Sequence, residues 1–381
     1  MMHELAVQFV ELGHAVTVIT PYPNLNIPSE VFTLDGITVR RFRSGVIKNT
    51  SKIKRAINET LLSYYGWRAY RNYFRQHPHD LIIYYSPTIF WGPLVSKLKG
   101  LWGARSYLVL RDFFPQWVID NGMLSERSPI ARYFRFFERL NYRAADTIGV
   151  QSPKNLQLFR QTAGVKRPSE VLYNWAADVQ STISSGFYRQ KFGLENKVVF
   201  FYGGNIGPAQ DMMNIVRLSH SLRAEESAYF VLVGNGDEVP LVRAAIEQGH
   251  AGNMLLLPSV TQVEFVQMLA EFDVGLFSLH RDHTTHNFPG KLLEYMRQRK
   301  PILGSINPGN DLQLVMEGAG AGLVTINGDD KGFFNNALSL LHNDERRTAM
   351  GCNGFKLLIS TFSARSAAQQ ILRSIESQRL S

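Results

Sequence analysis

The stretch KVVFFYGGNIGPAQDMMNIV, residues 197–216, decides the fold class. A β-rich apolar run ends at Tyr202, a turn that includes Gly204 and Gly207 follows, and a helical pattern begins near Asp211. A strand that passes through a tight turn into a helix is typical of parallel α/β sheets. Glycines also let backbone N–H groups approach an anion at a helix start. Because the stretch matches neither the Walker pattern nor GxGxxG, an ordinary strand-to-helix turn explains it equally well.

The same alternation of short β-rich runs and helical patterns extends along the whole chain. The further runs are AVTVIT, DLIIYYS, SYLVLRD, DTIGVQS, AYFVLVGNG, NMLLLPS, DVGLFSL, KPILGS and GAGLVTI. This pattern predicts two α/β units, each a parallel sheet with helices on both faces. We place the seam near residues 173–186, which gives domains at 1–177 and 178–364. A carboxyl-terminal helix at 365–381 can pack back on the first domain.

The bulk composition fits a folded protein of a reducing compartment. The chain has 381 residues, of which 45% are hydrophobic and 19% charged, so a large core is available and global disorder is excluded. Its single cysteine allows no intrachain disulfide. The first twenty residues contain Glu4 and Glu11 but no Lys or Arg, unlike a signal peptide. No run approaches the ~18 apolar residues of a spanning helix. We therefore expect a cytoplasmic protein, soluble or peripheral.

The net charge of +9 is concentrated in the first half of the chain. Residues 1–180 hold 23 Lys and Arg against 13 Asp and Glu, and residues 40–75 hold ten basic residues against one acid, Glu59. Aromatic residues are interleaved with the basic ones in residues 48–76, a composition that suits an anionic membrane surface. No nucleic-acid module accompanies it, so we predict no nucleic-acid partner. The alternative is that the aromatic rings pack on the sheet and the charges are solvated.

A second stretch, HNFPGKLLEYMRQRKPILG at residues 286–304, carries the best candidate site. Pro289 and Gly290 predict a helix that starts at Lys291, whose free N–H groups and ammonium can bind a diphosphate. Glu294 lies at i+3 on the same helix face and can accept hydrogen bonds from two vicinal ribose hydroxyls. The alternative is a solvated Lys/Glu pair on an amphipathic helix.

The segment PGKLLEYMRQRKPILGS resembles the donor-site signature of glycosyltransferase family 4, whose members have the GT-B fold. YGGNIGPAQDM, FVLVGNGDEVPLVRAA and LLPSVTQVEFVQMLAEFDVGLFSL agree in order and spacing, and ELAVQFVELGHAVTVIT, YYSPTIFWGP and RDFFPQW resemble the family's acceptor domain. The resemblance covers nearly the whole chain. It implies two Rossmann-like domains, with a UDP-sugar bound mainly by the carboxyl-terminal domain and the acceptor by the amino-terminal one.

The resemblance also assigns the donor-site residues. It makes Glu294 the ribose ligand and Lys291 a diphosphate contact. The remaining donor-binding set is Gly204, Asn205, Gly207, Gly234 and Gly290. His286 stands at the first glutamate of the family's Glu-x7-Glu motif, and we assign it to the transferred sugar. Asn205 and Gln210 replace an Arg and a Lys that many members use, so less positive charge is expected at the diphosphate.

Asp112 is the candidate for acceptor chemistry in the first domain. It follows the run SYLVLR, so a parallel sheet would place it at the carboxyl edge, where a carboxylate can position or deprotonate an acceptor hydroxyl. Ser86 and Arg111 lie at similar positions and are assigned to acceptor binding. The alternative is that Asp112 orders its own loop or pairs with Arg111. The loop with His280, His283 and His286 lacks fixed spacing and is a poor metal site, so no metal or other cofactor is expected.

The family resemblance fails at one point, the start of the chain. Members open with a β-strand and a glycine-bearing loop before the helix that matches MMHELAVQFVELG, and this chain has neither. We therefore expect the first strand of the amino-terminal sheet to be missing and its neighbours to lack ladder partners. A late-assigned start codon, with about 15–25 further residues encoded upstream, a truncated chain and a damaged enzyme would each explain this.

The predicted function is transfer of a sugar from a UDP-sugar to a polyprenyl-diphosphate-linked acceptor at the cytoplasmic face of the bacterial cytoplasmic membrane. The departures resemble a branch that builds O-antigen and capsule repeats and includes N-acetyl-L-fucosamine transferases, which makes that sugar the expected donor group. Retention of configuration is the family expectation. The alternatives are a UDP-N-acetylglucosamine 2-epimerase and a degenerate nucleotide-sugar-binding subunit.

Overall fold

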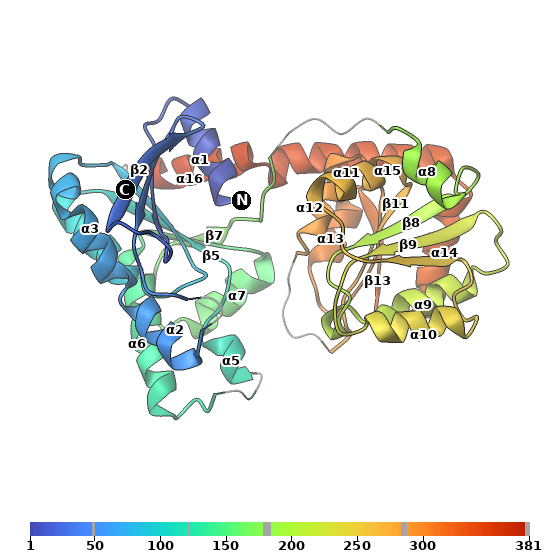
Figure 1. Ribbon diagram of the computed structural model, residues 1–381, viewed down its shortest axis with the longest axis horizontal. Helices are drawn as coiled ribbons and strands as arrows, with labels where there is room; N and C mark the ends of the chain where they lie inside the picture. The colour runs from blue at the N-terminus through green and yellow to red at the C-terminus, as the bar shows by residue number, and fades with distance from the viewer. Residues whose placement is uncertain (48–49, 121, 123, 178–183, 283–287, 378–381) are drawn as a thin grey trace. The chain divides into compact units, whose positions relative to one another are not determined.

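The computed structural model describes residues 1–47, 50–120, 122, 124–177, 184–282 and 288–377. The chain divides into two compact units (Figure 1). Unit 1 consists of Met1–Tyr173 together with Ala367–Ser381, and unit 2 of Asn174–Ser366. Each unit contains parallel strands and covering helices, so the α/β class predicted from the alternating pattern is confirmed.

Unit 2 is built on a parallel six-stranded sheet with the order β10-β9-β8-β11-β12-β13. The strands are β8 (Val198–Gly203), β9 (Ala228–Val233), β10 (Met254–Leu257), β11 (Val274–Ser278), β12 (Ile302–Ile306) and β13 (Gly322–Ile326). The helices are α8 (Phe187–Phe192), η1 (Pro208–Gln210), α9 (Met212–Ser221), α10 (Val239–Glu247), α11 (Gln262–Glu271), α12 (Lys291–Arg297), α13 (Leu312–Gly318), α14 (Asp330–Leu341), α15 (Asp344–Leu357) and η2 (Leu358–Phe362).

Both faces of this sheet are buried, as its continuous apolar strands require. Phe200 and Phe230 stack with their ring centroids 5.1 Å apart on the face that α9, α10 and α14 cover. The next residue, Phe201, points to the other face and contacts Phe265 of α11 and Phe272. Figure 1 shows these two groups of helices on opposite sides of the strands.

Unit 1 contains two separate sheets among its described residues. The strands are β1 (Thr17–Pro21), β2 (Ser29–Leu34), β3 (Ile37–Phe42), β4 (Leu81–Tyr85), β5 (Arg105–Leu110), β6 (Thr147–Val150) and β7 (Ser169–Val171). The helices are α1 (Met2–Glu11), α2 (Lys52–Thr60), α3 (Leu62–Gln76), α4 (Gly92–Trp102), α5 (Gln116–Asp120), α6 (Pro129–Ala144), α7 (Pro153–Thr162) and α16 (Ala364–Ser377).

The strands β1 and β4 are unpaired with each other. One sheet has the order β1-β3-β2 and the other β4-β5-β6-β7, so each of these two strands has a single ladder partner. Ile19 of β1 and Ile82 of β4 nevertheless pack against the same cluster, which is centred on Phe42, Phe74 and Leu98. The expectation that strands of the amino-terminal unit lack a ladder partner on one side is therefore confirmed for β1 and β4. Side chains from α3 and α4 join the two sheets.

Most of the aromatic side chains in residues 48–76 face inward. Phe74 and Tyr70 of α3 are buried, and Trp67 stacks on Phe74 with a centroid separation of 6.0 Å. The Arg40 guanidinium lies 3.4 Å from the centre of the Tyr73 ring. Tyr64 is 54% exposed, but for the other aromatic rings of α3 the interpretation that they pack inward is correct. The membrane surface predicted for this segment stays a prediction.

The last helix, α16, belongs to unit 1 from Ala367 onward. The Gln370 side-chain amide donates a 2.7 Å hydrogen bond to the carbonyl of Val171 at the end of β7. No described helix is long and apolar enough to cross a membrane.

Helix α6 is fixed against α4 by an unusually close backbone contact. Its start has a favourable cap, because the Ser128 hydroxyl accepts from the Ala131 N–H and Pro129 occupies the first turn. A Cβ built on Gly92 of α4 would lie 2.7 Å from the Asn141 backbone nitrogen. Only glycine allows α4 and α6 to approach this closely.

We therefore expect Gly92→Ala to lower the melting temperature by several degrees, because neither backbone can move aside without disturbing its sheet. Gly100→Ala in the same helix is the matched control, since a Cβ there meets nothing within 4 Å. That change should be neutral or stabilise by about 0.5–1 kcal/mol. Thermal unfolding followed by circular dichroism measures both, and equal effects would contradict the close contact.

Candidate functional site

Two glycine turns meet at the carboxyl edge of the unit 2 sheet. The Gly204 N–H donates to the Val233 carbonyl, and the Ile206 N–H donates to the Asn235 carbonyl, each at 2.9 Å. A Cβ built on Gly234 would lie 1.8 Å from the Gly204 carbonyl oxygen. Gly204 itself has φ +126°, which side-chain-bearing residues rarely adopt. These glycines are therefore required for the two turns to pack together.

Helix α12 is held beside these turns by Tyr295. The Tyr295 hydroxyl donates to the Leu276 carbonyl at 3.1 Å and accepts from the Gly203 N–H at 3.3 Å. The ring is fully buried. One side chain thus ties α12 to both β8 and β11. The predicted helix start at Lys291 is confirmed.

Lys291 is the cation of the site. Its Nζ lies 3.5 Å from the centre of the Tyr202 ring, and a Cβ on Gly204 would lie 3.4 Å from the same atom. Among the described residues no carboxylate forms an ion pair with Lys291. Burial of the ammonium lowers the pKa of Lys291 to about 7. An anionic ligand beside this amine would favour its protonated, charged form.

Glu294 pairs with Arg297, one turn further along α12, rather than with Lys291. The alternative of a solvated Lys/Glu pair therefore does not describe this helix. The carboxylate is oriented by Arg297 and remains partly exposed, so it can also accept hydrogen bonds from a ligand.

The positions where a family resemblance expects two cations hold a neutral amide pair. Asn205 Nδ2 donates to Gln210 Oε1 at 2.7 Å, and the Asn205 carbonyl accepts from the Tyr202 hydroxyl. A Cβ on Gly207 would lie 2.8 Å from Asn205 Nδ2, so this glycine makes room for the pair. Gly290 precedes α12 and is exposed, and a Cβ there meets nothing within 4 Å.

The histidine loop is only partly described. His283 and His286 lie outside the described residues, so the role predicted for His286 stays a prediction. The His280 N–H donates to the Ala209 carbonyl at 2.9 Å, and its ring lies 3.8 Å from Asp282. The described residues contain no group of three or more side chains that could hold a metal ion.

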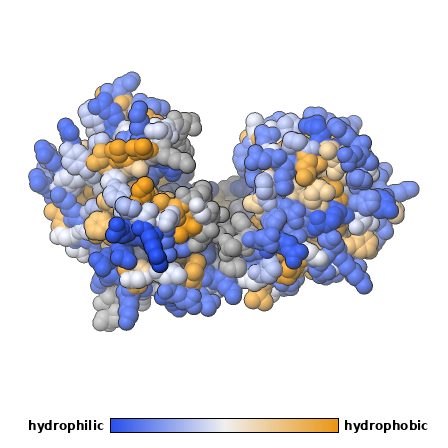
Figure 2. All heavy atoms as spheres, turned by 90° about the horizontal axis from the view of Figure 1, so that it is seen from below, coloured by the Kyte–Doolittle hydropathy of each residue, from blue (hydrophilic) through white to orange (hydrophobic). Residues whose placement is uncertain are grey.

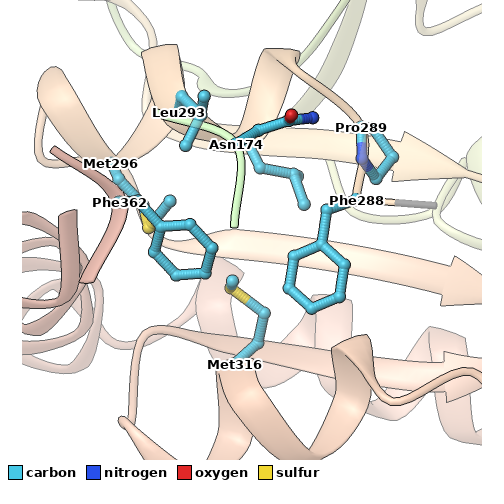
Figure 3. Close-up of a pocket in the computed structure, with 8 residues that line it drawn as sticks. Asn174, Phe288, Pro289, Leu293, Met296, Met316 and Phe362 are labelled. Atoms are coloured by element: carbon cyan, nitrogen blue, oxygen red, sulfur yellow. The ribbon is translucent and has the colours of Figure 1, made fainter. Parts of the chain in front are cut away.

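The far side of α12 closes a small apolar cavity of about 10 Å³ (Figure 3). Its lining consists of Asn174, Phe288, Pro289, Leu292, Leu293, Met296, Met316 and Phe362. Space of this size holds at most about one water molecule, so the cavity cannot receive a sugar or nucleotide. It belongs to the packing that supports α12, with the Phe288 and Phe362 rings 5.9 Å apart.

The three residues predicted for acceptor chemistry come together in unit 1. Ser86 follows β4 and accepts from the Arg111 N–H at 3.0 Å. The buried Arg111 guanidinium donates to the carbonyls of Leu172 and Tyr173, so it also orders the chain after β7. The Asp112 side chain is exposed to solvent. Partial desolvation by the surrounding protein raises the pKa of its carboxyl, and the positive charge of Arg111 opposes this rise. Asp112 is thus the member of this group best placed to meet a ligand.

Sequence reasoning missed Tyr202 and Tyr295. Tyr202 is the last aromatic residue before the glycine turn, and Tyr295 lies one helical turn after Lys291. Both residues stand at positions that the sequence predicts for a strand end and a helix. Their buried hydroxyls and their contacts with Lys291 and Gly203 could not be predicted, because they depend on distant parts of the chain.

Comparison with known proteins shows which families the two halves of the chain match. Residues 1–175 match the family described as glycosyl transferase 4-like domain, and residues 184–357 match glycosyl transferases group 1. The chain is 26% identical over 308 residues to the putative colanic acid biosynthesis glycosyl transferase WcaI of Escherichia coli (strain K12), covering 74% of this chain and 72% of that protein.

Solved structures share the fold. Sucrose-phosphate synthase from Thermosynechococcus elongatus aligns with a TM-score of 0.69 at 14% identity, over 100% of this chain and 92% of its own. Anabaena HepE in complex with UDP aligns with a TM-score of 0.63 at 16% identity, over 89% of this chain and 86% of its own. The predicted GT-B fold, with two Rossmann-like domains, is confirmed.

The low pKa of Lys291 predicts a pH-dependent stability. Its pKa of about 7 in the folded protein is below the ordinary value of 10.5, so the unfolded chain binds more protons between these values. The cost of burying the ammonium is full below pH 7 and disappears as pH rises toward 10.5. We expect Lys291→Met to raise the melting temperature at pH 6 by several degrees, and by much less at pH 10.

Lys300 is the matched control for this measurement, because burial also lowers the pKa of Lys300, to about 8. Its Nζ donates to the Ala270 carbonyl at 2.8 Å, so Lys300→Met removes a hydrogen bond as well as a charge. It should stabilise less than Lys291→Met at pH 6. A lower melting temperature for Lys291→Met at pH 6 would show that the ammonium is already compensated.

Proposed function

The chain is a glycosyltransferase, with a glycosyl transferase 4-like domain followed by a glycosyl transferases group 1 domain, and we propose that it moves a sugar from a UDP-sugar to a polyprenyl-diphosphate-linked acceptor. The product belongs to surface polysaccharide of the O-antigen or capsule type, and N-acetyl-L-fucosamine is the transferred sugar. The enzyme works as a peripheral protein at the cytoplasmic face of the bacterial membrane, without a metal or other cofactor.

The observation that carries this proposal is the ammonium of Lys291. It lies over the Tyr202 ring beside Gly204 and has no carboxylate partner among the described residues. A diphosphate supplies the missing negative charge, and backbone N–H groups of the glycine turn can share it. The naming of HepE as a complex with UDP, and of WcaI as a colanic acid biosynthesis transferase, supports the donor and pathway classes.

Glu294 would hold the ribose. It lies one turn along α12 from Lys291, and its ion pair with Arg297 fixes the carboxylate, which would accept hydrogen bonds from the vicinal hydroxyls. Gly204, Asn205, Gly207, Gly234 and Gly290 would complete the donor site. The amides of Asn205 and Gln210 stabilise the turn and carry no charge. The charge–charge attraction for the diphosphate would therefore come mainly from Lys291.

On the acceptor side, Asp112 would accept the proton of the attacking hydroxyl or orient that hydroxyl. Its raised pKa makes the carboxylate a stronger base than an ordinary aspartate. Ser86 and Arg111 would position it, since Ser86 binds the Arg111 backbone and Arg111 binds the carbonyls beyond β7. His286 would contact the transferred sugar and make no contact with the nucleotide.

The proposal is tested by incubating the protein with a panel of UDP-sugars and a lipid-diphosphate-linked N-acetylhexosamine. We expect UDP release and a glycosylated lipid only when both substrates are present. Conversion of UDP-N-acetylglucosamine without acceptor would favour the 2-epimerase alternative. Tight UDP binding with no turnover of any pair would favour the binding-subunit alternative.

The donor-site assignment predicts that Lys291→Ala and Glu294→Gln each weaken UDP binding about ten- to a hundredfold, because each removes a charge-assisted contact worth roughly 1.5–3 kcal/mol. Affinity of the wild type should fall as pH rises above 7, since Lys291 loses its proton there. Titration calorimetry measures both effects. The exposed Lys331 provides the control, and Lys331→Ala should leave the affinity unchanged.

The acceptor-side assignment predicts that Asp112→Asn lowers the turnover number at least tenfold and leaves the UDP dissociation constant unchanged. His286→Ala should show the same split between turnover and nucleotide affinity. Transfer rates measured beside UDP titrations decide this. Loss of UDP affinity in either variant would place that side chain on the nucleotide instead.

A further inference from the structure

Helices α2 and α6 of unit 1 present large apolar side chains to solvent. Ile53 and Ile57 are 75% and 54% exposed and lie four residues apart on α2. Ile130 and Phe136 of α6 are both 57% exposed. Tyr64 at the start of α3 and Tyr133 of α6 are also exposed. We call this set the α2–α6 ridge: Ile53, Ile57, Tyr64, Ile130, Tyr133 and Phe136.

The end of α2 contacts α6, which brings these side chains to neighbouring parts of the surface. The hydroxyls of Thr60 and Tyr133 are 2.6 Å apart in a hydrogen bond that joins the end of α2 to α6. Phe90 adds a second connection, because its carbonyl accepts from the Ser63 hydroxyl of α3 and its ring lies 4.9 Å from that of Phe137 in α6. Figure 2 shows hydrophobic and hydrophilic residues intermixed on the face of unit 1 that is seen from below.

The charge around the ridge is positive. The exposed basic residues are Lys54, Arg68, Arg71 and Arg75 on α2 and α3, and Arg132, Arg139 and Arg143 on α6. The two acids of these helices are already paired: Glu59 with Arg55 at 2.7 Å, and the buried Glu138 with Arg135 at 3.0 Å. The unpaired outward-facing charge on α2, α3 and α6 is therefore positive, and the exposed Glu126 lies just before α6.

We propose that the α2–α6 ridge docks on an anionic lipid bilayer, with its isoleucine and phenylalanine side chains in the acyl boundary and the flanking basic residues on the headgroups. Exposed apolar side chains flanked by Lys and Arg are the composition that binds such an interface. The proposal rests on the membrane-linked acceptor proposed above and identifies which surface meets the membrane.

The position of the ridge suits a lipid-linked acceptor. Phe90, which links α3 to α6, belongs to the loop that follows β4, and the same loop begins with Ser86. A bilayer against α2 and α6 would therefore lie next to the loop that carries an acceptor residue. A diphosphate-linked sugar could reach that loop while its polyprenyl chain stays in the membrane.

Other occupants fit this surface less well. Single-stranded nucleic acid favours flat aromatic platforms, whereas half of the ridge is isoleucine and most aromatic rings of α3 are buried. A second copy of the chain would bring like charges together across the contact. A bilayer accepts both the aliphatic side chains and the positive charge.

The test is co-sedimentation of the full chain with vesicles of phosphatidylcholine, with and without phosphatidylglycerol. Ile53→Ser/Ile57→Ser and Ile130→Ser/Phe136→Ser should each weaken binding about tenfold or more, because exposed apolar area is lost. Lys54→Gln/Arg68→Gln/Arg71→Gln should remove most of the preference for phosphatidylglycerol and flatten the salt dependence.

Matched controls come from unit 2, which has similar side chains elsewhere. Val263→Ser/Leu314→Ser removes two apolar side chains that are 67% and 78% exposed, and Arg346→Gln/Lys356→Gln removes two exposed charges. Both should bind vesicles as the wild type does. Equal melting temperatures across the set establish that every variant is folded.

The inference is overturned if the wild type does not bind the vesicles, or if the ridge variants bind as well as the controls. Competition by single-stranded RNA that the ridge variants abolish, without vesicle binding, would assign the surface to nucleic acid. Self-association lost in the same variants, again without vesicle binding, would assign it to a second copy.

Transfer assays separate this inference from the proposed function. The ridge variants should retain transfer to a water-soluble acceptor with a truncated prenyl chain and lose it only for an acceptor embedded in vesicles. Absence of any transfer by the wild type, with the vesicle results as expected, would refute the function and leave the docking surface standing.

Discussion

The structure of unit 2 depends on a place where two backbones touch without a side chain between them. The Gly204 carbonyl occupies the position that a Cβ of Gly234 would need. This contact brings the turns after β8 and β9 together and leaves space beside Gly204. Lys291 occupies that space from α12, with the Tyr202 ring as its neighbour. Substituting either glycine would therefore disturb the turns and the cation together.

The strands of unit 2 were predictable because both faces of its sheet are buried, which gives continuous apolar runs such as VVFFY. The hairpin of β2 and β3 was missed, although Asp35 and Gly36 form a turn with positive φ at both residues and Asp-Gly is a strong hairpin signal. Strand β7 has three residues, too few for any periodicity to be recognised.

The candidate site was predictable where the information is local. Pro289 and Gly290 predict the start of α12, and the i, i+3 spacing of Lys291 and Glu294 predicts that both lie on one face of this helix. Their partners were not predictable, because Tyr202 is distant in sequence from Lys291, and Arg297 competes for Glu294 on the same helix. The same limit applies to residues 48–76, where composition cannot tell that Trp67 and Phe74 pack inward while Ile53 and Ile57 stay exposed.

Unit 2 is continuous in sequence, but unit 1 is closed by residues that come after it. During synthesis the chain from Asn174 to Ser366 can complete its sheet as soon as it leaves the ribosome. Unit 1, although its strands are made first, must wait for α16 before Gln370 can reach the Val171 carbonyl. The unit whose strands are made first is thus the one that is completed last.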